Sequence, residues 1–183
     1  MIFNPTPLNG AFVIDLEPIR DERGFFSRTF CKREFQSIDH SKEFVQFNHS
    51  SNGARGTLRG MHFQVAPSAE TKLIRCIRGK VYDVIIDIRK GSPTFLEHFG
   101  VILAEENMKM IYVPEGFAHG FQTMEDHTQL LYHHTAYYAA EHERGLHHAD
   151  RALGIQWPMT PVHLTARDEK HPFIDNNFTG IEL

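Results

Sequence analysis

The chain has 183 residues, of which 41% are apolar, and a formal charge of −4 at pH 7. That length can bury a substantial core without disulfides or metals, so we expect one domain over residues 1–183. The negative charge argues against nonspecific nucleic-acid binding, which requires a basic surface. No stretch approaches the roughly 20 apolar residues of a membrane helix, and the first residues form no apolar leader. We therefore expect a soluble cytoplasmic protein that does not associate with membranes.

Short runs of alternating apolar and polar residues, separated by turns, recur through the first half of the chain. The alternation predicts a strand over 13–19 and a returning strand over 25–30, joined by a turn at Asp21–Gly24. Residues 32–35 could begin a short helix. The same alternation predicts four further strands, which are 44–50, 57–64 and a pair over 72–88 joined at Arg78-Gly79.

The second half of the chain continues this pattern, with strands predicted over 99–103, 110–113, 120–124 and 128–138. Beyond them lie segments rich in Pro, Asp and Gly, with room for short helices near 149–153. Many short strands spaced by turns are typical of a β-sandwich or β-barrel. Helix-length amphipathic patterns are almost absent, which disfavours a doubly wound α/β fold.

One candidate for acid–base chemistry is His62, within Arg59-Gly60-Met61-His62-Phe63-Gln64. A lone strand histidine is more often a hydrogen-bonded core or surface residue than a catalyst. A cation nearby, such as Arg59 or Lys72, favours the neutral imidazole that a general base needs. The pattern therefore suggests, without establishing, a site for proton transfer on an anionic substrate.

Several cations are candidates for binding phosphate, because Arg offers a two-pronged donor and Lys a point charge. They are Arg23, Arg59, Lys72, Arg75 and Arg78. The alternative is that most are solvated charges on strand faces. Three tyrosines on the predicted strand 128–138 are either core aromatics with their hydroxyls at the rim, or a source of a proton opposite the base. They are Tyr132, Tyr137 and Tyr138.

A metal site is not expected. His119 follows Pro114-Glu115-Gly116 at a spacing that, with an upstream His-x-His, would suggest a metal-binding cupin barrel. Here the upstream segment reads His62-Phe63-Gln64, so an amide replaces one imidazole, and such a site needs three or four strong ligands. Neighbouring strand residues point to opposite faces, so the doublets His133-His134 and His147-His148 are not ready chelates. A Gly-x-Ser-x-Gly turn and glycine-rich phosphate loops are also missing.

Several motifs in register resemble the dTDP-4-dehydrorhamnose 3,5-epimerase family, from about Arg23 to Asp168. They are Glu22-Arg23-Gly24-Phe25-Phe26, Arg59-Gly60-Met61-His62-Phe63-Gln64, Lys72-Leu73-Ile74-Arg75, Pro114-Glu115-Gly116-Phe117-Ala118-His119-Gly120-Phe121 and Glu141-His142-Glu143-Arg144-Gly145. The resemblance implies an all-β, cupin-like barrel of the jelly-roll type, with a few short helices mainly in its C-terminal part. It further implies a homodimer that needs no cofactor or metal and epimerises C3, C5 or both of a nucleotide-linked 4-keto-6-deoxyhexose, in deoxysugar and surface-polysaccharide biosynthesis.

The resemblance also assigns roles. It makes His62 the base, Asp168 the carboxylate that orients it, Lys72 the stabiliser of the enolate and Tyr132 the acid on the opposite face. The matching substrate-binding positions are Arg23 and Arg59 at the diphosphate with Tyr137 nearby, Gln46, Asn48 and Phe26 around the nucleotide, His119 close to the site, and Glu143. Phe26 is a candidate for contribution across the dimer.

One position departs from the family pattern, because Arg28 stands where the family usually carries Glu near the thymine. A carboxylate accepts the thymine N3–H, whereas Arg accepts nothing and could instead serve the N3 and O2 acceptors of cytosine. Two hypotheses follow: a preference for a CDP-linked sugar, or an Arg28 that turns to solvent or to the diphosphate. The alternatives to the epimerase are a non-catalytic sugar-nucleotide-binding barrel, a 3-epimerase or ketoisomerase acting on another nucleotide such as CDP, and a degenerate metal cupin.

Overall fold

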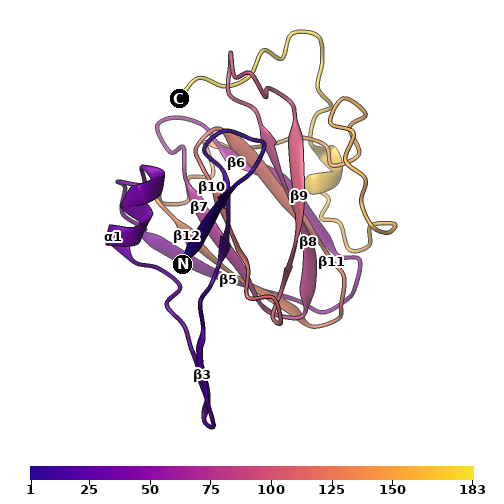
Figure 1. The fold of residues 1–183 in the computed structure, drawn as a ribbon. Coiled ribbons are helices and arrows are strands. Elements are labelled where there is room, and N and C mark those ends of the chain that lie inside the picture. Colours follow the sequence, from indigo (N-terminus) through magenta and orange to yellow (C-terminus); the bar gives the residue numbers. More distant parts are fainter.

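The computed structural model describes all residues, 1–183, and its body consists of two facing antiparallel β-sheets (Figure 1). The first sheet has the order β1 (Ile2–Pro5), β2 (Phe12–Asp15), β10 (Met110–Val113), β7 (Lys72–Arg78), β12 (Thr128–His134) and β5 (Gln46–Asn52). The second has the order β13 (Glu143–Gly145), β6 (Leu58–Gln64), β11 (Phe117–Thr123), β8 (Lys80–Asp87) and β9 (His98–Ala104). The prediction of an all-β fold is confirmed.

The main hydrophobic core contains twelve buried residues from both sheets. Ile74 and Cys76 of β7 alternate inward from the first sheet, and Val81 and Ile85 of β8 do so from the second. All four are fully buried. Because a buried aliphatic side chain contributes about 1.5–3 kcal/mol, this alternation holds the sheets face to face.

β6 and β11 approach one another unusually closely, and this approach places two histidines side by side. A Cβ on Gly60 would lie 2.6 Å from the Cα of Gly120, and the φ of Gly60 is +121°, so the position requires glycine. The register of the two strands shifts between His119 and Phe121, as at a β-bulge. On the side of the shift toward the site, His119 pairs directly with His62.

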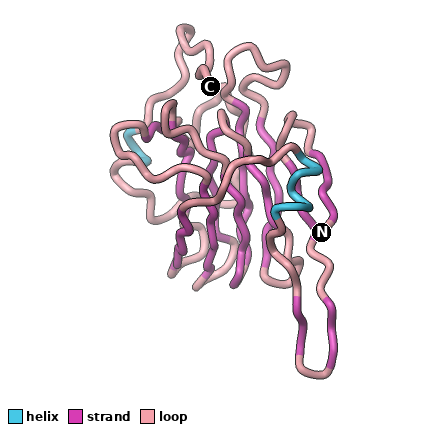
Figure 2. The backbone as a smooth tube through the Cα atoms, turned by 90° about the vertical axis from the view of Figure 1, so that its left-hand side faces the viewer, coloured by secondary structure: helices cyan, strands magenta, loops and turns pink.

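A hairpin formed by β3 (Ile19–Asp21) and β4 (Gly24–Phe26) extends away from the two sheets, as both views show (Figures 1 and 2). Its large apolar side chains are exposed: Ile19 by 71% and Phe26 by 75%. Next in the chain, α1 (Lys32–Phe35) and η1 (Gln36–Ile38) cover one face of the first sheet, where the fully buried Phe35 clusters with residues of β2, β7 and β10. The predicted turn at Asp21–Gly24 and the predicted helix at 32–35 are confirmed.

The predicted strand over 128–138 is too long, because β12 ends at His134. The two strands that flank β12 both begin opposite His134, which pairs with Gln46, the first residue of β5, and with Lys72, the first residue of β7. Without a partner strand beyond this point the ladder stops. Tyr137 and Tyr138 therefore leave the sheet and are exposed.

The expectation of helices mainly in the C-terminal part is wrong. Residues 149–153 form turns, in which the Asp150 carboxylate accepts the backbone N–H groups of Ala152 and Ile174. This carboxylate offers the backbone an alternative to helical hydrogen bonds. The remaining C-terminal helical element is a single 3₁₀ turn, η2 (Asp168–Lys170), and no helix is long and apolar enough to cross a membrane. The strands β1 and β13 were not predicted.

Candidate active site

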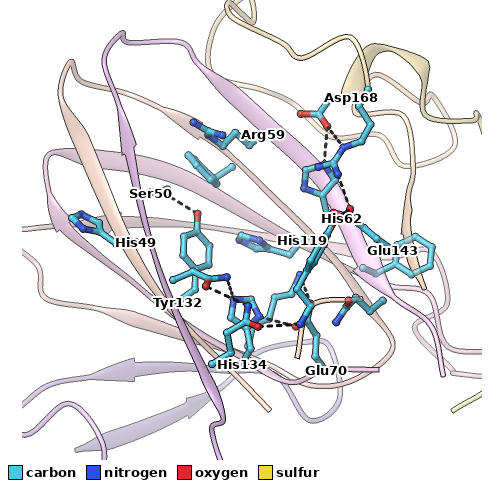
Figure 3. A pocket seen from close by; sticks show the side chains of 18 of the residues that line it. His49, Ser50, Arg59, His62, Glu70, His119, Tyr132, His134, Glu143 and Asp168 are labelled. Atoms are coloured by element: carbon cyan, nitrogen blue, oxygen red, sulfur yellow. Dashed lines mark hydrogen bonds and ion pairs between the residues drawn. The ribbon is translucent and has the colours of Figure 1, made fainter. Parts of the chain in front are cut away.

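A pocket of about 330 Å³ opens between the ends of the two sheets (Figure 3). Side chains from β5, β7 and β12 of the first sheet and from β6, β11 and β13 of the second line it, together with the segment around η2. Nine of the predicted residues lie in its lining: Gln46, Asn48, Arg59, His62, Lys72, His119, Tyr132, Glu143 and Asp168.

The first functional pair in the pocket is His62 on β6 and Asp168 on η2, with 2.7 Å between Nε2 and Oδ1. Burial opposes ionisation of Asp168, but the hydrogen bond and charge of His62, with the charge of His171, outweigh it and lower the pKa of this carboxyl. The carboxylate accepts the Nε2–H of His62, which leaves Nδ1 with the free lone pair of the ring. The pair therefore presents an oriented imidazole whose Nδ1 faces away from the carboxylate.

A third donor, His171, lies beside this pair, and the three potential ligand atoms are within 4.8 Å of one another. His171 Nε2 is 3.5 Å from Asp168 Oδ1, and Gly145 makes room for the ring, since a Cβ there would lie 2.3 Å from it. The 2.7 Å between His62 Nε2 and Asp168 Oδ1 is a hydrogen-bond distance. Two ligands of a tetrahedral zinc ion would stand about 3.3 Å apart. The geometry fits a hydrogen-bonded His62–Asp168 pair with a second imidazole close by better than a metal centre.

Tyr132 enters the pocket from the other sheet, on β12 (Figure 3). Its hydroxyl is 3.5 Å from Ser50 Oγ, and burial raises its pKa well above the ordinary value. At neutral pH this phenol therefore carries its proton. His119 stands edge-on to Tyr132, with ring centroids 6.2 Å apart, and its Nε2 is 2.9 Å from the buried Asp83 Oδ2.

The carboxylate of Glu70, just before β7, contacts two neighbours, one through each oxygen. Oε1 is 3.2 Å from Lys72 Nζ, and Oε2 is 2.7 Å from His134 Nδ1. All three side chains are about nine-tenths buried. Burial opposes ionisation of Glu70, but the charge of Lys72 and then the hydrogen bond from His134 prevail, so its pKa lies below the ordinary value.

The remaining charges of the pocket differ in how they are paired. Arg167 binds Glu143, with 2.6 Å between Nη1 and Oε2, and Glu143 also accepts the hydroxyl of Tyr138 at 2.8 Å. Arg59 has no carboxylate partner; its Nε donates to Asn52 Oδ1 at 2.7 Å. Arg59 is thus the lining cation with charge to spare for an anionic ligand.

Four predicted site residues lie outside the pocket of this chain. Arg23 is on the β3–β4 hairpin and pairs with Asp21. Phe26 is on the same hairpin and is exposed. Arg28 is directed to Glu34, with 2.5 Å between Nη1 and Oε1. Tyr137 is 70% exposed, and its neighbour Tyr138 lines the pocket instead.

Sequence reasoning missed several lining residues, chiefly Glu70, His134, Ser50 and Arg167. A signal existed for His134, because strand alternation puts it on the same face as Tyr132. For Glu70 and Arg167, which lie outside strands, no comparable signal exists in the sequence.

Two sheets that hold a half-buried histidine paired with a buried carboxylate, a lysine and a protonated tyrosine define a cupin-like enzyme of acid–base type. The family model described as dTDP-4-dehydrorhamnose 3,5-epimerase matches residues 5–176, and the chain belongs to that family. It is 40% identical to the dTDP-4-dehydrorhamnose 3,5-epimerase of Salmonella typhimurium over 177 residues, which cover 96% of each chain.

Solved structures agree with this assignment. The Legionella pneumophila dTDP-6-deoxy-D-glucose-3,5-epimerase, in complex with dTDP-4-keto-L-rhamnose, is 35% identical and superposes with a TM-score of 0.92, covering 100% of this chain and 98% of that one. A 3′-monoepimerase from Streptomyces bikiniensis, in complex with dTDP-quinovose, is 32% identical with a TM-score of 0.86, covering 92% and 86%. The chain is therefore an isomerase, an epimerase of nucleotide-linked keto-deoxyhexoses in deoxysugar biosynthesis.

Proposed function

We propose that the 183 residues act as one epimerase domain, in which His62 removes a proton from a carbon next to the C4 ketone of a nucleotide-linked 4-keto-6-deoxyhexose. The ketone acidifies the protons on C3 and C5, because the electron pair that remains is delocalised onto oxygen as an enolate. Asp168 accepts the Nε2–H of His62 and stabilises the imidazolium once Nδ1 has taken the proton.

The Lys72 ammonium then stabilises the negative charge on the enolate oxygen, and Tyr132 returns a proton to the other face of the carbon. The observation that carries this proposal is the origin of the two proton-transfer groups: His62 belongs to one sheet and Tyr132 to the sheet that faces it. Removal on one side and delivery on the other is what inverts a centre.

The substrate's diphosphate is assigned to Arg59, the lining cation without a carboxylate partner. Gln46 and Asn48 on β5 line the same pocket and are assigned to the nucleotide. We propose a dTDP-linked sugar, because relatives act on or bind dTDP sugars by name. The ion pair of Arg28 with Glu34 supports the hypothesis that Arg28 turns away from the base.

The enzyme is proposed to work as a homodimer in which the β3–β4 hairpin completes the pocket of the partner. Arg23 and Phe26 match substrate-binding positions of the family, yet they lie on a projecting hairpin outside this chain's own pocket (Figure 2). An exposed apolar hairpin of this kind is suited to burial against a second copy. The cytoplasm is the proposed location, since Cys31 and Cys76 are both free thiols.

Deuterium wash-in followed by NMR tests the proposed function. The enzyme and its His62→Ala variant are incubated in D₂O with dTDP-4-keto-6-deoxyglucose, and in parallel with the CDP-linked sugar. Exchange at C3 and C5 that the variant loses would establish the base and both centres, and exchange at one carbon would establish a single-centre epimerase. Equal exchange in the variant would refute the assignment of His62, and a lack of exchange with both nucleotides would refute the proposed function. Faster exchange with the CDP sugar would revive the cytosine hypothesis for Arg28.

A further inference from the structure

A continuous network of three hydrogen bonds and one ion pair crosses the pocket from β5 to β7. Gln46 Nε2 donates to Asn48 Oδ1 at 3.3 Å, and Asn48 Nδ2 is 3.3 Å from His134 Nε2. His134 Nδ1 is 2.7 Å from Glu70 Oε2, whose other oxygen is 3.2 Å from Lys72 Nζ. The network thus connects the residues assigned to the nucleotide with the ammonium assigned to the enolate.

The direction of each hydrogen bond in this network follows from the donors and acceptors that its members offer. Glu70 is ionised and accepts only, so His134 Nδ1 carries the hydrogen and its Nε2 carries the lone pair. That lone pair needs a donor, which fixes the amide nitrogen of Asn48 toward the ring and the amide oxygen toward Gln46. His134 therefore determines which hydrogen-bonding groups Asn48 has left for a ligand.

The fold gives His134 this bridging place. On β12 it stands opposite Gln46 of β5 on one side and opposite Lys72 of β7 on the other. Alternation puts it on the same face as Tyr132, and the two rings lie nearly parallel, 18° apart with centroids 6.1 Å apart. Its side chain is 10% exposed, so the ring is held by these neighbours rather than by water.

On the basis of the function proposed above, we propose that His134 is a positioning residue that links the two ends of the substrate site. Through Nε2 it orients the Asn48 amide toward the nucleoside diphosphate, and through Nδ1 and Glu70 it holds the Lys72 ammonium for the enolate. Because His134 holds the two groups through two different atoms, its two roles can be separated by substitution. One variant can keep the group at Nδ1 and lose the group at Nε2, and another can do the reverse.

Two variants make this division. In His134→Asn the amide nitrogen stands near the position of Nδ1, so the donor to Glu70 is kept and the acceptor for Asn48 is lost. In His134→Gln the amide oxygen reaches the position of Nε2, so the acceptor for Asn48 is kept and the donor to Glu70 is lost. We expect His134→Asn to weaken dTDP binding and raise KM roughly tenfold with little change in kcat. We expect His134→Gln to lower kcat roughly tenfold with little change in dTDP binding.

Calorimetric titration with dTDP and steady-state kinetics with the dTDP-4-keto sugar measure the two effects. The matched control is His133→Asn, one residue away on the opposite face of β12, which should leave Kd, KM and kcat unchanged. Equal effects of both His134 variants on KM and kcat, or no effect of either, would overturn the proposal. The dTDP titration does not depend on turnover, so a wild-type enzyme without wash-in would refute the proposed function and still leave the Asn48 half of this proposal open to test.

Discussion

At the scale of single residues, the hydrogen bond between His62 and Asp168 decides how the base is presented. The substitution Asp168→Asn keeps the size of the side chain but offers an amide that can turn its N–H₂ toward the ring. His62 would then place its hydrogen on Nδ1, and the basic lone pair would face the wrong way. We expect wash-in to slow by about 10²–10⁴-fold.

The same Asp168→Asn protein should still bind dTDP with wild-type affinity, because Asp168 lies on the His62 side of the pocket and not beside Asn48. Calorimetric titration with dTDP provides that control. A wash-in rate within twofold of the wild type would show that Asp168 does not orient the base.

Tyr132 offers a second prediction at this scale, because it acts after the base. In Tyr132→Phe, His62 can still remove the proton, exchange it with D₂O and return deuterium to the face from which the proton came. We therefore expect wash-in to continue while the inverted product becomes scarce, at least tenfold below the wild type. NMR distinguishes the two outcomes, since deuterated starting sugar and epimer have different spectra. Parallel loss of wash-in and inversion would contradict the assignment of Tyr132 as the opposite acid.

At the scale of elements, the hairpin β3–β4 projects from the two sheets, and its exposed apolar residues make it the best candidate for dimer contact. If it completes the partner's pocket, two inactive variants can restore each other. His62→Ala lacks the base but presents an intact hairpin, whereas Arg23→Ala presents a defective hairpin but keeps the base. Each mixed dimer then holds one complete site.

Mixing the two variants after separate purification and subunit exchange should raise activity to about a quarter of the wild-type value, because half of the dimers are mixed and each has one of two sites. Light scattering after gel filtration gives the oligomeric state in parallel. A dimer whose mixture gains no activity would show that each pocket is complete within its own chain, and a monomer would refute the dimer itself.

Elements were also what the sequence predicted best. The strand over 110–113 and the joint at Arg78-Gly79 match β10 and the β7–β8 turn, because local alternation and a glycine decide them. β13 has three residues and is fixed only by its pairing with β6, and the end of β12 depends on where β5 and β7 begin. No local pattern contains such information.

For the site, too, the sequence indicated the residues that local patterns mark and not those that only the fold brings together. His62 stands out within its own strand, but Asp168 is 106 residues away and nothing around it marks a partner, so it was reached only through family resemblance. Glu70 and His134 come together because β7 and β12 are neighbours, 64 residues apart in the chain. Such pairs depend on the fold as a whole.

At the scale of the whole molecule, several buried histidines make stability depend on pH. Burial lowers the pKa of His40, His133, His148 and His171, with the charge of His62 adding to the effect at His171. A histidine with a lowered folded-state pKa binds fewer protons in the native than in the unfolded state once the pH is below about 6.5. Stability is therefore complete above that pH and falls as the pH falls through the folded-state values.

We expect the melting temperature to be nearly constant from pH 8 to 7 and to drop by several degrees between pH 6.5 and 5. Each unit of lowered pKa is worth up to about 1.4 kcal/mol, and a protein of this size loses about 2–4 °C per kcal/mol. A further loss should begin below about pH 4, where protons compete for Asp87, whose hydrogen bonds from Arg89, Ser92 and Thr94 outweigh burial and lower its pKa to about 2.

The substitution His40→Asn tests the origin of the first loss. His40 is 4% exposed, its Nδ1 is 3.1 Å from the hydroxyl of Tyr112, and its ring stacks on Phe44. Asparagine places its amide near the position of Nδ1, so it can keep a hydrogen bond to Tyr112. It takes up no proton, so the melting temperature should depend less steeply on pH between 6.5 and 5. His127→Asn is the matched control, since His127 is exposed and asparagine tolerates its positive φ. If both variants kept the wild-type slope, the loss of stability would have to arise from groups other than His40.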